Sequence, residues 1–232
     1  MKRSVARLGP ELLAELAEPC RDCVFWQLDP VRRARVDGAA GAAKRAWLEE
    51  VLAEWGTCGQ VVLLDGRPVA HLIYAPEAYL PGAATFPTAP VSPDAVLLTT
   101  VHVDPEHRGG GLGRLLVQRM ARDLVTRGDA GAVEAYAATG ALSAACAVPE
   151  GFLAAVGFTP QRAHPTSPRM RMDLRTALTW KDEVELAWER LLGVVRPSPK
   201  ASGTQAMNAS SSLSMAALGL APTIDLTTSP PE

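Results

Sequence analysis

Apolar and polar residues follow one another with two different periods along this chain, one typical of helices and one typical of strands. Apolar residues that recur every three to four positions form one face of a helix, and they predict helices at 11–18, 44–55, 112–127 and 150–157. Short apolar runs bounded by turn residues predict strands at 24–28, 60–64, 68–75, 95–103, 133–137, 158–162 and 170–175. The chain up to residue 175 therefore reads as a domain that mixes strands with helices.

One connection between these elements is unusually long. Residues 76–94 contain five prolines and almost no charge. A loop of this length inside a compact domain is uncommon and often covers a binding site. We expect either a lid, with Glu77, Tyr79 and Phe86 as its contact residues, or a surface loop without a role.

The chain beyond residue 175 has a different pattern. Apolar residues at helical spacing within 176–196 predict an amphipathic helix, which either the sheet or the second subunit of a homodimer would cover. Residues 197–232 are rich in Ser, Thr, Ala and Pro without periodicity, which predicts a disordered tail. The expected organisation adds an N-terminal segment with a short helix at 1–21 and the main domain at 22–175.

The stretch 95–114 carries the most specific chemistry. A strand ends before Pro105, three adjacent glycines follow, and a helix begins at Leu112. The first amides of a helix have no partner within it, and the helix end carries partial positive charge, so these amides can bind a phosphate. Glycines permit positive φ and let a ligand approach the backbone closely. The sequence therefore predicts an anion site flanked by the guanidinium groups of Arg108 and Arg114.

Two common phosphate-binding motifs do not fit this stretch. A P-loop requires lysine after its last glycine, but Gly113 is followed by Arg114. A dinucleotide fingerprint that began at Gly109 would need glycine in place of Arg114, and one that began at Gly111 would need glycine in place of Leu116. A glycine-rich turn without a ligand is the remaining alternative, although three adjacent glycines weaken the start of a helix.

The spacing Arg108-x-x-Gly111-x-Gly113, after a strand that ends Val-x-Val-Asp-Pro, resembles motif A of the GNAT superfamily of N-acetyltransferases. The Gly-Phe pair at 157–158 is similar to the pair that closes a helix in that family. The resemblance extends over about 24–175. It implies an α/β (α+β) fold with a mixed, mostly antiparallel sheet of about seven strands flanked by helices.

The resemblance also implies a co-substrate, acetyl-CoA, and the residues that bind it. In the family the fourth and fifth strands splay apart, and the pantetheine arm of acetyl-CoA lies between them. Carried over to this chain, the main chain of Val101 and Val103 would pair with pantetheine. The amides expected to bind the pyrophosphate are those of Arg108, Gly109, Gly111, Leu112, Gly113 and Arg114.

The implied activity is transfer of an acetyl group from acetyl-CoA to a primary amine of a small molecule or protein. The alternative is a non-catalytic acyl-CoA-binding regulatory or scaffold module. Catalytic residues stay unassigned, because Leu153 occupies the position of the family's tyrosine acid, and Leu97 and Thr99 occupy positions of its base. His71 and His102 are expected to be ordinary sheet residues. Other polar residues that could line the site are Tyr74, Tyr136, Cys146 and Glu150.

The cysteines are expected to be ordinary reduced thiols. Cys20 and Cys23 form a CxxC motif, which in other proteins marks a zinc half-site or a redox pair. A zinc site would need Cys58 and Cys146 as further ligands. The expected strands place Cys23 and Cys58 at opposite ends of neighbouring strands, so no metal is expected.

Composition narrows the range of partners. The 232 residues are 47% hydrophobic and 21% charged, with a net charge of −2, as in a soluble globular protein. This balance favours neither nucleic acid nor an anionic membrane as a partner. The basic start is not followed by an apolar core of a secretory signal, and no run is long enough to span a bilayer. A cytoplasmic location is therefore expected.

Overall fold

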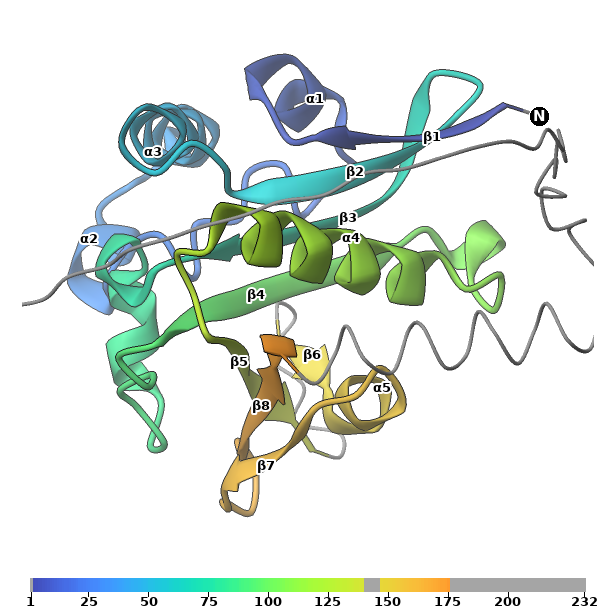
Figure 1. Ribbon diagram of the computed structural model, residues 1–232. Coiled ribbons are helices and arrows are strands. Elements are labelled where there is room, and N and C mark those ends of the chain that lie inside the picture. The colour runs from blue at the N-terminus through green and yellow to red at the C-terminus, as the bar shows by residue number, and fades with distance from the viewer. Residues whose placement is uncertain (1, 140–146, 176–232) are drawn as a thin grey trace, which may run out of the picture. The chain divides into compact units, whose positions relative to one another are not determined.

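The computed structural model describes residues 2–139 and 147–175 and consists of one twisted sheet with helices on both faces (Figure 1). The sheet has the order β1-β2-β3-β4-β5-β8-β7, and β6 pairs with β5. Neighbours are antiparallel except for the pairs β4–β5 and β5–β6. The mixed, mostly antiparallel fold is thus confirmed. The strands are β1 (Arg3–Arg7), β2 (Gly59–Leu64), β3 (Arg67–Ala75), β4 (Ala95–Val103), β5 (Ala132–Ala138), β6 (Val148–Pro149), β7 (Thr159–Arg162) and β8 (Arg169–Asp173).

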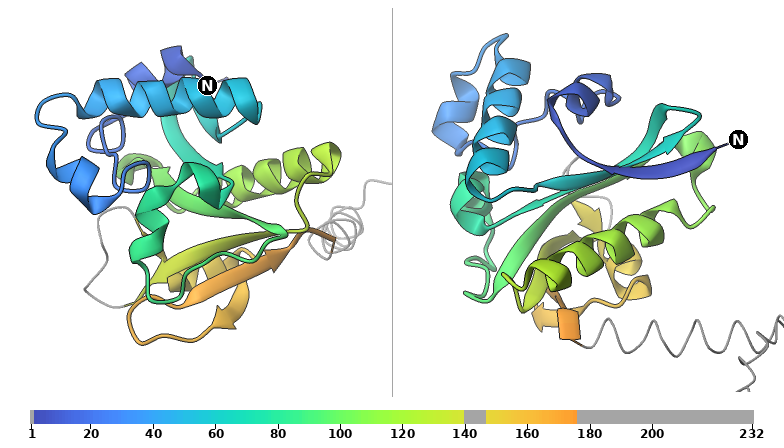
Figure 2. Two further views of the ribbon diagram at one scale, coloured as in Figure 1. Left: turned by 90° about the vertical axis from the view of Figure 1, so that its left-hand side faces the viewer. Right: turned by 45° about the horizontal axis from the view of Figure 1, so that its top comes forward.

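In the part of the chain that the structure describes, five α-helices and three short 3-10 helices connect the strands. The α-helices are α1 (Pro10–Glu15), α2 (Pro30–Ala34), α3 (Ala40–Glu54), α4 (Leu112–Arg127) and α5 (Glu150–Ala155). The 3-10 helices are η1 (Glu77–Tyr79), η2 (Pro81–Thr85) and η3 (Pro105–His107). Core residues of α4 and α5 pack on one face of the sheet, and core residues of α1 and α3 pack on the other (Figure 2).

The α4 face of the sheet is covered by one apolar side of that helix. Leu116, Met120 and Leu124 are fully buried there, at the spacing that brings them onto one side of a helix. They belong to one core cluster with Leu72 of β3 and Leu98 of β4. Burial of each such side chain contributes about 1.5–3 kcal/mol, so α4 is firmly fixed on the sheet.

The opposite face is covered by α3. Trp47, Leu48 and Val51 are buried and form a second core cluster with Val61 of β2 and Ile73 of β3. The apolar stripe expected at 44–55 is thus core. Because α3 and α4 occupy opposite faces, the central strands β3 and β4 are buried on both sides along much of their length.

The prediction of a strand at 24–28 is wrong, because these residues form turns. The edge beside β2 is instead occupied by β1, which pairs with it from Arg3–Leu64 to Arg7–Gln60. The segment expected to precede the domain therefore supplies a strand of the sheet. The apolar run at 24–28 is buried in a different way, since Trp26 accepts a hydrogen bond of 3.0 Å from the amide of Gly82 in the long loop.

A β-bulge interrupts the pairing of β3 with β4. Tyr74 pairs with Leu98 and Ile73 pairs with Thr100, so Thr99 is an additional residue in β4. The Thr99 hydroxyl donates a hydrogen bond of 3.0 Å to the carbonyl oxygen of Ile73 and is fully buried. The bulge changes the direction of β4 near the place where its pairing with β5 ends.

The amphipathic helix and tail predicted within 176–232 lie outside the described residues. Residues 140–146, which follow β5 in the sequence, lie outside them as well. Among the described helices, none combines the length and the apolar character that crossing a bilayer requires.

Candidate active site

The strands β4 and β5 separate after a short parallel contact. Their pairing comprises three residue pairs, from Ala95–Ala132 to Leu97–Glu134. Both strands then continue, β4 to Val103 and β5 to Ala138, without pairing with each other. Residues 100–103 of β4 are partly exposed, although β4 lies in the middle of the sheet. We call this interruption of the pairing, which β6 borders at Ala137 and Ala138, the β4–β5 opening.

The main chain of two residues of β4 points into this opening. The amide of Asp104 donates a hydrogen bond of 2.9 Å to the carbonyl oxygen of Val69, next to β3. In an antiparallel pair, residues directed toward the partner alternate with residues directed away from it. The N–H and C=O groups of Val103 and Val101 are therefore directed away from β3, toward the β4–β5 opening.

The glycine turn after β4, residues 109–111, provides backbone amides at the start of α4. Gly109 and Gly111 have φ angles of 78° and 77°, a region that strongly favours glycine, and Gly111 is the N-cap of α4. A Cβ atom at either position would have no atom within 4 Å. Within residues 2–139 and 147–175, no hydrogen-bond acceptor is recorded for the amides of Gly109, Gly111, Leu112 and Gly113. The turn thus combines open space with available donors, as a diphosphate requires.

Gly113 has a packing role. A Cβ atom at this position would lie 2.8 Å from Cε2 and 3.0 Å from Cζ of Phe152 in α5. The first turn of α4 therefore lies directly against the Phe152 ring. Glycine is needed here for close approach of two helices, because the ring leaves no room for a side chain.

The two arginines expected to flank the anion site both bind carbonyl groups with their side chains. Arg108 Nε donates a hydrogen bond of 3.0 Å to the carbonyl oxygen of Val103, at the end of β4. Arg114 Nη2 donates one of 2.7 Å to the carbonyl oxygen of Ala155, at the end of α5. Their guanidinium groups fix the strand and the helices around the glycine turn, and their positive charges remain next to it.

The family's usual catalytic positions carry no obvious proton-transfer group in this chain. Leu97 and Leu153 are fully buried in the core. The hydroxyl of Thr99 is buried and bound to the carbonyl of Ile73. These three positions therefore supply no general acid or base.

The tyrosines considered from the sequence lie on opposite faces of the sheet. The Tyr74 hydroxyl is 3.2 Å from the Thr57 hydroxyl and donates a bond of 3.1 Å to Asp123 of α4. The Tyr136 hydroxyl donates a bond of 3.2 Å to Glu77 Oε1 on the other face. Burial raises the pKa of both phenols well above the usual range, so both are neutral at pH 7.

The contact between Tyr136 and Glu77 had no sequence signal, since 59 residues separate the two. The other two polar candidates add little. Glu150 is the first residue of α5 and is partly exposed, and Cys146 lies outside the described residues.

His71 and His102 form a stacked pair on adjacent strands. Their ring centroids are 5.3 Å apart, and His102 Nε2 is 3.2 Å from Asp104 Oδ1. His71 is 2% exposed, and its Nε2 atom has no hydrogen-bond partner among the described residues. Burial, with a smaller contribution from His102, lowers the pKa of His71 to about 3, so this imidazole is neutral.

The described cysteines, Cys20, Cys23 and Cys58, form no disulfide. Cys20 lies in a turn and Cys23 follows that turn outside any strand, so the strand argument used for their position was wrong. Cys58 is buried, and burial raises the pKa of its thiol to about 12. In the part of the chain that the structure describes, no three His, Cys, Asp or Glu side chains are arranged to hold a metal ion.

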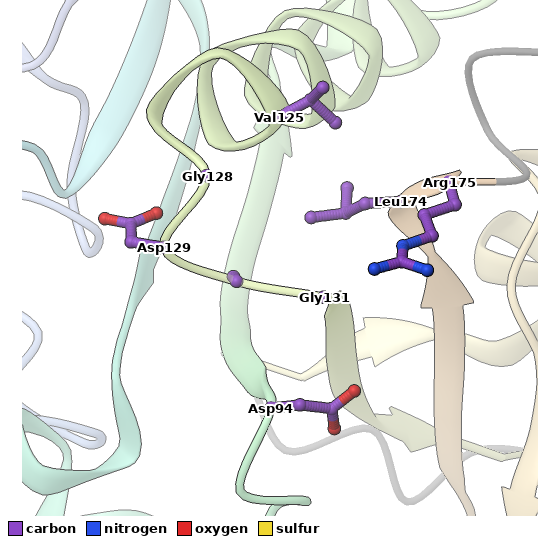
Figure 3. Close-up of a pocket in the computed structure, with 8 residues that line it drawn as sticks. Asp94, Val125, Gly128, Asp129, Gly131, Leu174 and Arg175 are labelled. Atoms are coloured by element: carbon purple, nitrogen blue, oxygen red, sulfur yellow. The ribbon is translucent and has the colours of Figure 1, made fainter. Parts of the chain in front are cut away.

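A cavity of about 430 Å³ lies at the other end of α4 (Figure 3). Its acidic side chains are already paired, Asp94 with Arg171 at 2.7 Å and Asp129 with Arg127 at 2.6 Å. A helix of 16 residues is about 24 Å long, so this cavity is separate from the glycine turn. It is lined by Asp94, Val125, Gly128, Asp129, Ala130, Gly131, Leu174 and Arg175.

Comparison with known proteins agrees with this geometry. The model of the acetyltransferase (GNAT) family matches residues 9–148, more than half of the chain. The structure resembles PaiA N-acetyltransferase from Thermoplasma acidophilum in complex with coenzyme A, with a TM-score of 0.50, 12% identity, and coverage of 75% of this chain and 99% of that chain.

It also resembles aminoglycoside acetyltransferase AAC(6')-Ib in complex with coenzyme A, with a TM-score of 0.50, 15% identity, and coverage of 77% of this chain and 98% of that chain. No curated protein matches the sequence. At these identities the two structures bear on the fold alone, whereas the family model bears on the sequence. The chain therefore belongs to the GNAT family of acetyltransferases, and it is an acyltransferase that uses acetyl-CoA as its co-substrate.

Proposed function

We propose that acetyl-CoA binds along the β4–β5 opening, with its diphosphate at the glycine turn and its thioester toward the place where β4 and β5 meet. The observation that supports this most directly is the N-cap of α4. Gly111 has positive φ, its Cβ position is open, and the amides beside it have no acceptor within the described residues. Such an arrangement favours an anion.

The pantetheine arm is the part of the co-substrate that we assign to β4. Its amides can pair with strand main chain as an additional strand would. Val101 and Val103 have main-chain groups directed into the opening, although the Val103 carbonyl already accepts a bond from Arg108. Val101 therefore offers both its N–H and its C=O to pantetheine, and Val103 offers its N–H.

The diphosphate is assigned to the backbone rather than to side chains. Phosphate oxygens at the glycine turn would accept hydrogen bonds from amides that the helix itself cannot use. The charges of Arg108 and Arg114 lie beside the turn and would add long-range attraction while their side chains hold carbonyl groups. The amides proposed to bind are those of Gly109, Gly111, Leu112, Gly113 and Arg114, together with that of Arg108, which also donates a long bond of 3.4 Å to the carbonyl oxygen of Pro105.

The reaction is acyl transfer from a thioester to an amine. An alkyl ammonium has a pKa of about 10.4, so it must lose a proton before its nitrogen can attack the thioester carbonyl. The carbonyl oxygen becomes negative in the tetrahedral intermediate, where a strand amide that faces the opening would stabilise it. The thiolate then leaves. General acid–base help contributes only about 10²–10⁴-fold, so transfer is feasible without a tyrosine at the position of Leu153.

An assay that follows thiol release from acetyl-CoA tests this proposal. We expect the purified full-length protein to bind CoA by calorimetry and to release thiol with a primary amine from a panel of small molecules and peptides. Binding of CoA without thiol release across the panel would count against catalysis. Absence of CoA binding would count against the site itself.

The proposal also places the acetyltransferase domain before residue 176, with β1 included in it. The segments 176–196 and 197–232 would then be appendages. Truncation after residue 175 should leave CoA affinity unchanged, as measured by calorimetry. A large loss of affinity would assign those segments to the site.

A further inference from the structure

Glu77 differs from Glu134, another carboxylate near the β4–β5 opening, in having no cationic partner recorded among the described residues. Glu77 begins η1 in the long loop 76–94, and its Oε1 accepts a hydrogen bond of 3.2 Å from the Tyr136 hydroxyl. Tyr136 lies on β5 two residues beyond Glu134, the last residue that pairs with β4. The Tyr136 ring belongs to the core cluster on the face opposite α4. Glu77 therefore lies over the sheet close to the place where β4 and β5 separate.

The loop that carries Glu77 is held in place by ring stacking. Phe86 of this loop stacks on Tyr136 with ring centroids 4.6 Å apart and an interplanar angle of 8°. It also stacks on Trp26, at 4.9 Å and 6°. Farther along, the Thr88 hydroxyl donates a bond of 3.0 Å to the carbonyl oxygen of Ser167. These contacts fix loop 76–94 on the separated half of β5 and give Glu77 a defined position.

Every hydrogen-bond donor recorded for Glu77 is neutral. The amide of Val91 lies 3.1 Å from each of its carboxylate oxygens, and the Tyr136 hydroxyl is the third donor. None of the ion pairs recorded among the described residues involves Glu77. The sequence of 140–146 contains no basic residue, and neither does loop 76–94. The half-buried carboxylate thus has oriented neutral donors but no counter-charge from these segments.

Glu134, on the same face of β5, shows the opposite arrangement. It is fully buried and forms ion pairs with Arg169 at 3.2 Å and with Arg171 at 3.1 Å. Arg169 and Arg171 are therefore paired with Glu134. Glu77 is only partly exposed and its recorded donors are all neutral, so its carboxylate keeps a negative charge that a cationic ligand at this place would offset.

The surface next to Glu77, formed by Tyr79 of the loop and the C-terminal end of α3, is also acidic. The Tyr79 hydroxyl donates a bond of 2.9 Å to Glu54 of α3, and Glu50 lies close enough to raise the pKa of that phenol further. This end of α3 and the loop therefore present negative charge on the side of the sheet opposite α4. A negatively charged surface of this kind attracts cations and repels acidic acceptors.

We infer that Glu77 binds a cationic group of the acceptor, so that the preferred acceptor is an amine with a second positive charge. This inference rests on the proposed function, because it takes the β4–β5 opening as the place of transfer. One amine of the acceptor loses its proton to water and attacks the thioester carbonyl, so that a C–N bond forms, the C–S bond breaks and CoA leaves as the thiolate. The second amine stays protonated at Glu77. Diamines of the alkyl class have this chemistry.

Two amines that differ only in the second charge provide the test. Full-length protein is assayed by thiol release with 1,4-diaminobutane and with butylamine, and CoA binding is measured by calorimetry in parallel. A hydrogen bond between charged groups predicts a preference for the diamine in kcat/KM of roughly ten- to hundredfold. In Glu77→Gln, which keeps the shape of the side chain but removes its charge, we expect this ratio to fall toward one.

Glu15→Gln is the matched control, because Glu15 is exposed on α1 and outside the site. It should keep the preference of the wild type. A wild type that uses both amines equally, or neither, overturns the inference, and so does a preference that survives in Glu77→Gln. If CoA itself fails to bind, the proposed function fails first. The calorimetric measurement thus separates the two failures.

Discussion

Arg108 Nε and the carbonyl oxygen of Val103 are joined by a hydrogen bond of 3.0 Å, so the side chain folds back over the end of β4. This bond connects the two parts of the proposed site, the strand that would pair with pantetheine and the turn that would bind the diphosphate. It also uses one of the acceptors that face the β4–β5 opening. Arg108 therefore has a positioning role that a free phosphate-binding arginine would not have.

Replacement of Arg108 by alanine should weaken CoA binding by about tenfold, equivalent to about 1.4 kcal/mol. The reason is the loss of both a positive charge near the diphosphate and the bond that orders the end of β4. Calorimetric titration with CoA measures the effect. Arg119→Ala, a change at an exposed position of α4, should leave the affinity near that of the wild type, and an equal loss in both variants would contradict the assignment.

Aspartate at Gly111 should abolish CoA binding, because a carboxylate would repel the diphosphate at the N-cap of α4. Gly128 provides a matched control at the other end of the same helix, with φ of 73° and no atom within 4 Å of its Cβ position. Each change to aspartate should cost about 1–2 kcal/mol of stability through the left-handed conformation. CoA titration should then find loss of binding in Gly111→Asp only.

Gly111→Asn separates charge from shape in the same experiment. Asparagine tolerates the left-handed region and resembles aspartate in size. We expect weakened but measurable CoA binding in this variant. Equal affinity of Gly111→Asp and the wild type would show that no diphosphate lies at this turn.

Alanine at Gly113 should destabilise the fold by about 1–3 kcal/mol, the usual cost of overpacking. Its Cβ atom would lie 2.8 Å from the Phe152 ring. Phe152→Leu replaces the ring by a shorter side chain and so removes the atoms that this Cβ would meet. The double variant should therefore recover part of the stability that Gly113→Ala loses. Urea denaturation of the four proteins in a double-mutant cycle measures this coupling, and strictly additive effects would contradict the contact.

The free energy of unfolding should decrease as the pH is lowered, because of His71. Burial, with His102 nearby, lowers its folded pKa to about 3 from an ordinary value of 6.5. Between these pH values His71 binds more protons in the unfolded chain than in the folded one. Its contribution to stability is therefore fully present above pH 6.5 and decreases as the pH falls. The decrease is at most about 1.4 kcal/mol per pH unit.

His71→Leu removes this titration and should reduce the difference in unfolding free energy between pH 7 and pH 5. Urea denaturation at both values provides the measurement. An unchanged difference in the variant would show that other groups, rather than His71, determine the acid sensitivity.

The part of the site that is local in sequence could be predicted. The strand before Asp104, the turn at 109–111 and the helix from Leu112 follow one another, so residue order and spacing were sufficient to identify them. The packing role of Gly113 could not be predicted, because it depends on Phe152, a residue 39 positions away. The same reason applies to Glu77 and Tyr136, which the loop brings together only in the folded chain.

The errors in the predicted fold have a common physical origin. The run at 24–28 is as apolar as a strand, but its burial comes from the long loop and the core beneath it rather than from a sheet neighbour. The strand β1 is short and bounded by Arg3 and Arg7, so its weak apolar pattern gave no signal. Its pairing with β2 is what makes it a strand. Edge strands are determined by their partners more than by their own composition.

The assignment of the diphosphate to backbone amides is tested most directly by amide NMR spectra of the full-length protein, titrated with CoA and separately with pantetheine. We predict large shifts for the amides of Gly109, Gly111 and Gly113 with CoA, and small shifts for them with pantetheine, which lacks the diphosphate. CoA that shifts other amides and leaves these three unchanged would contradict the account.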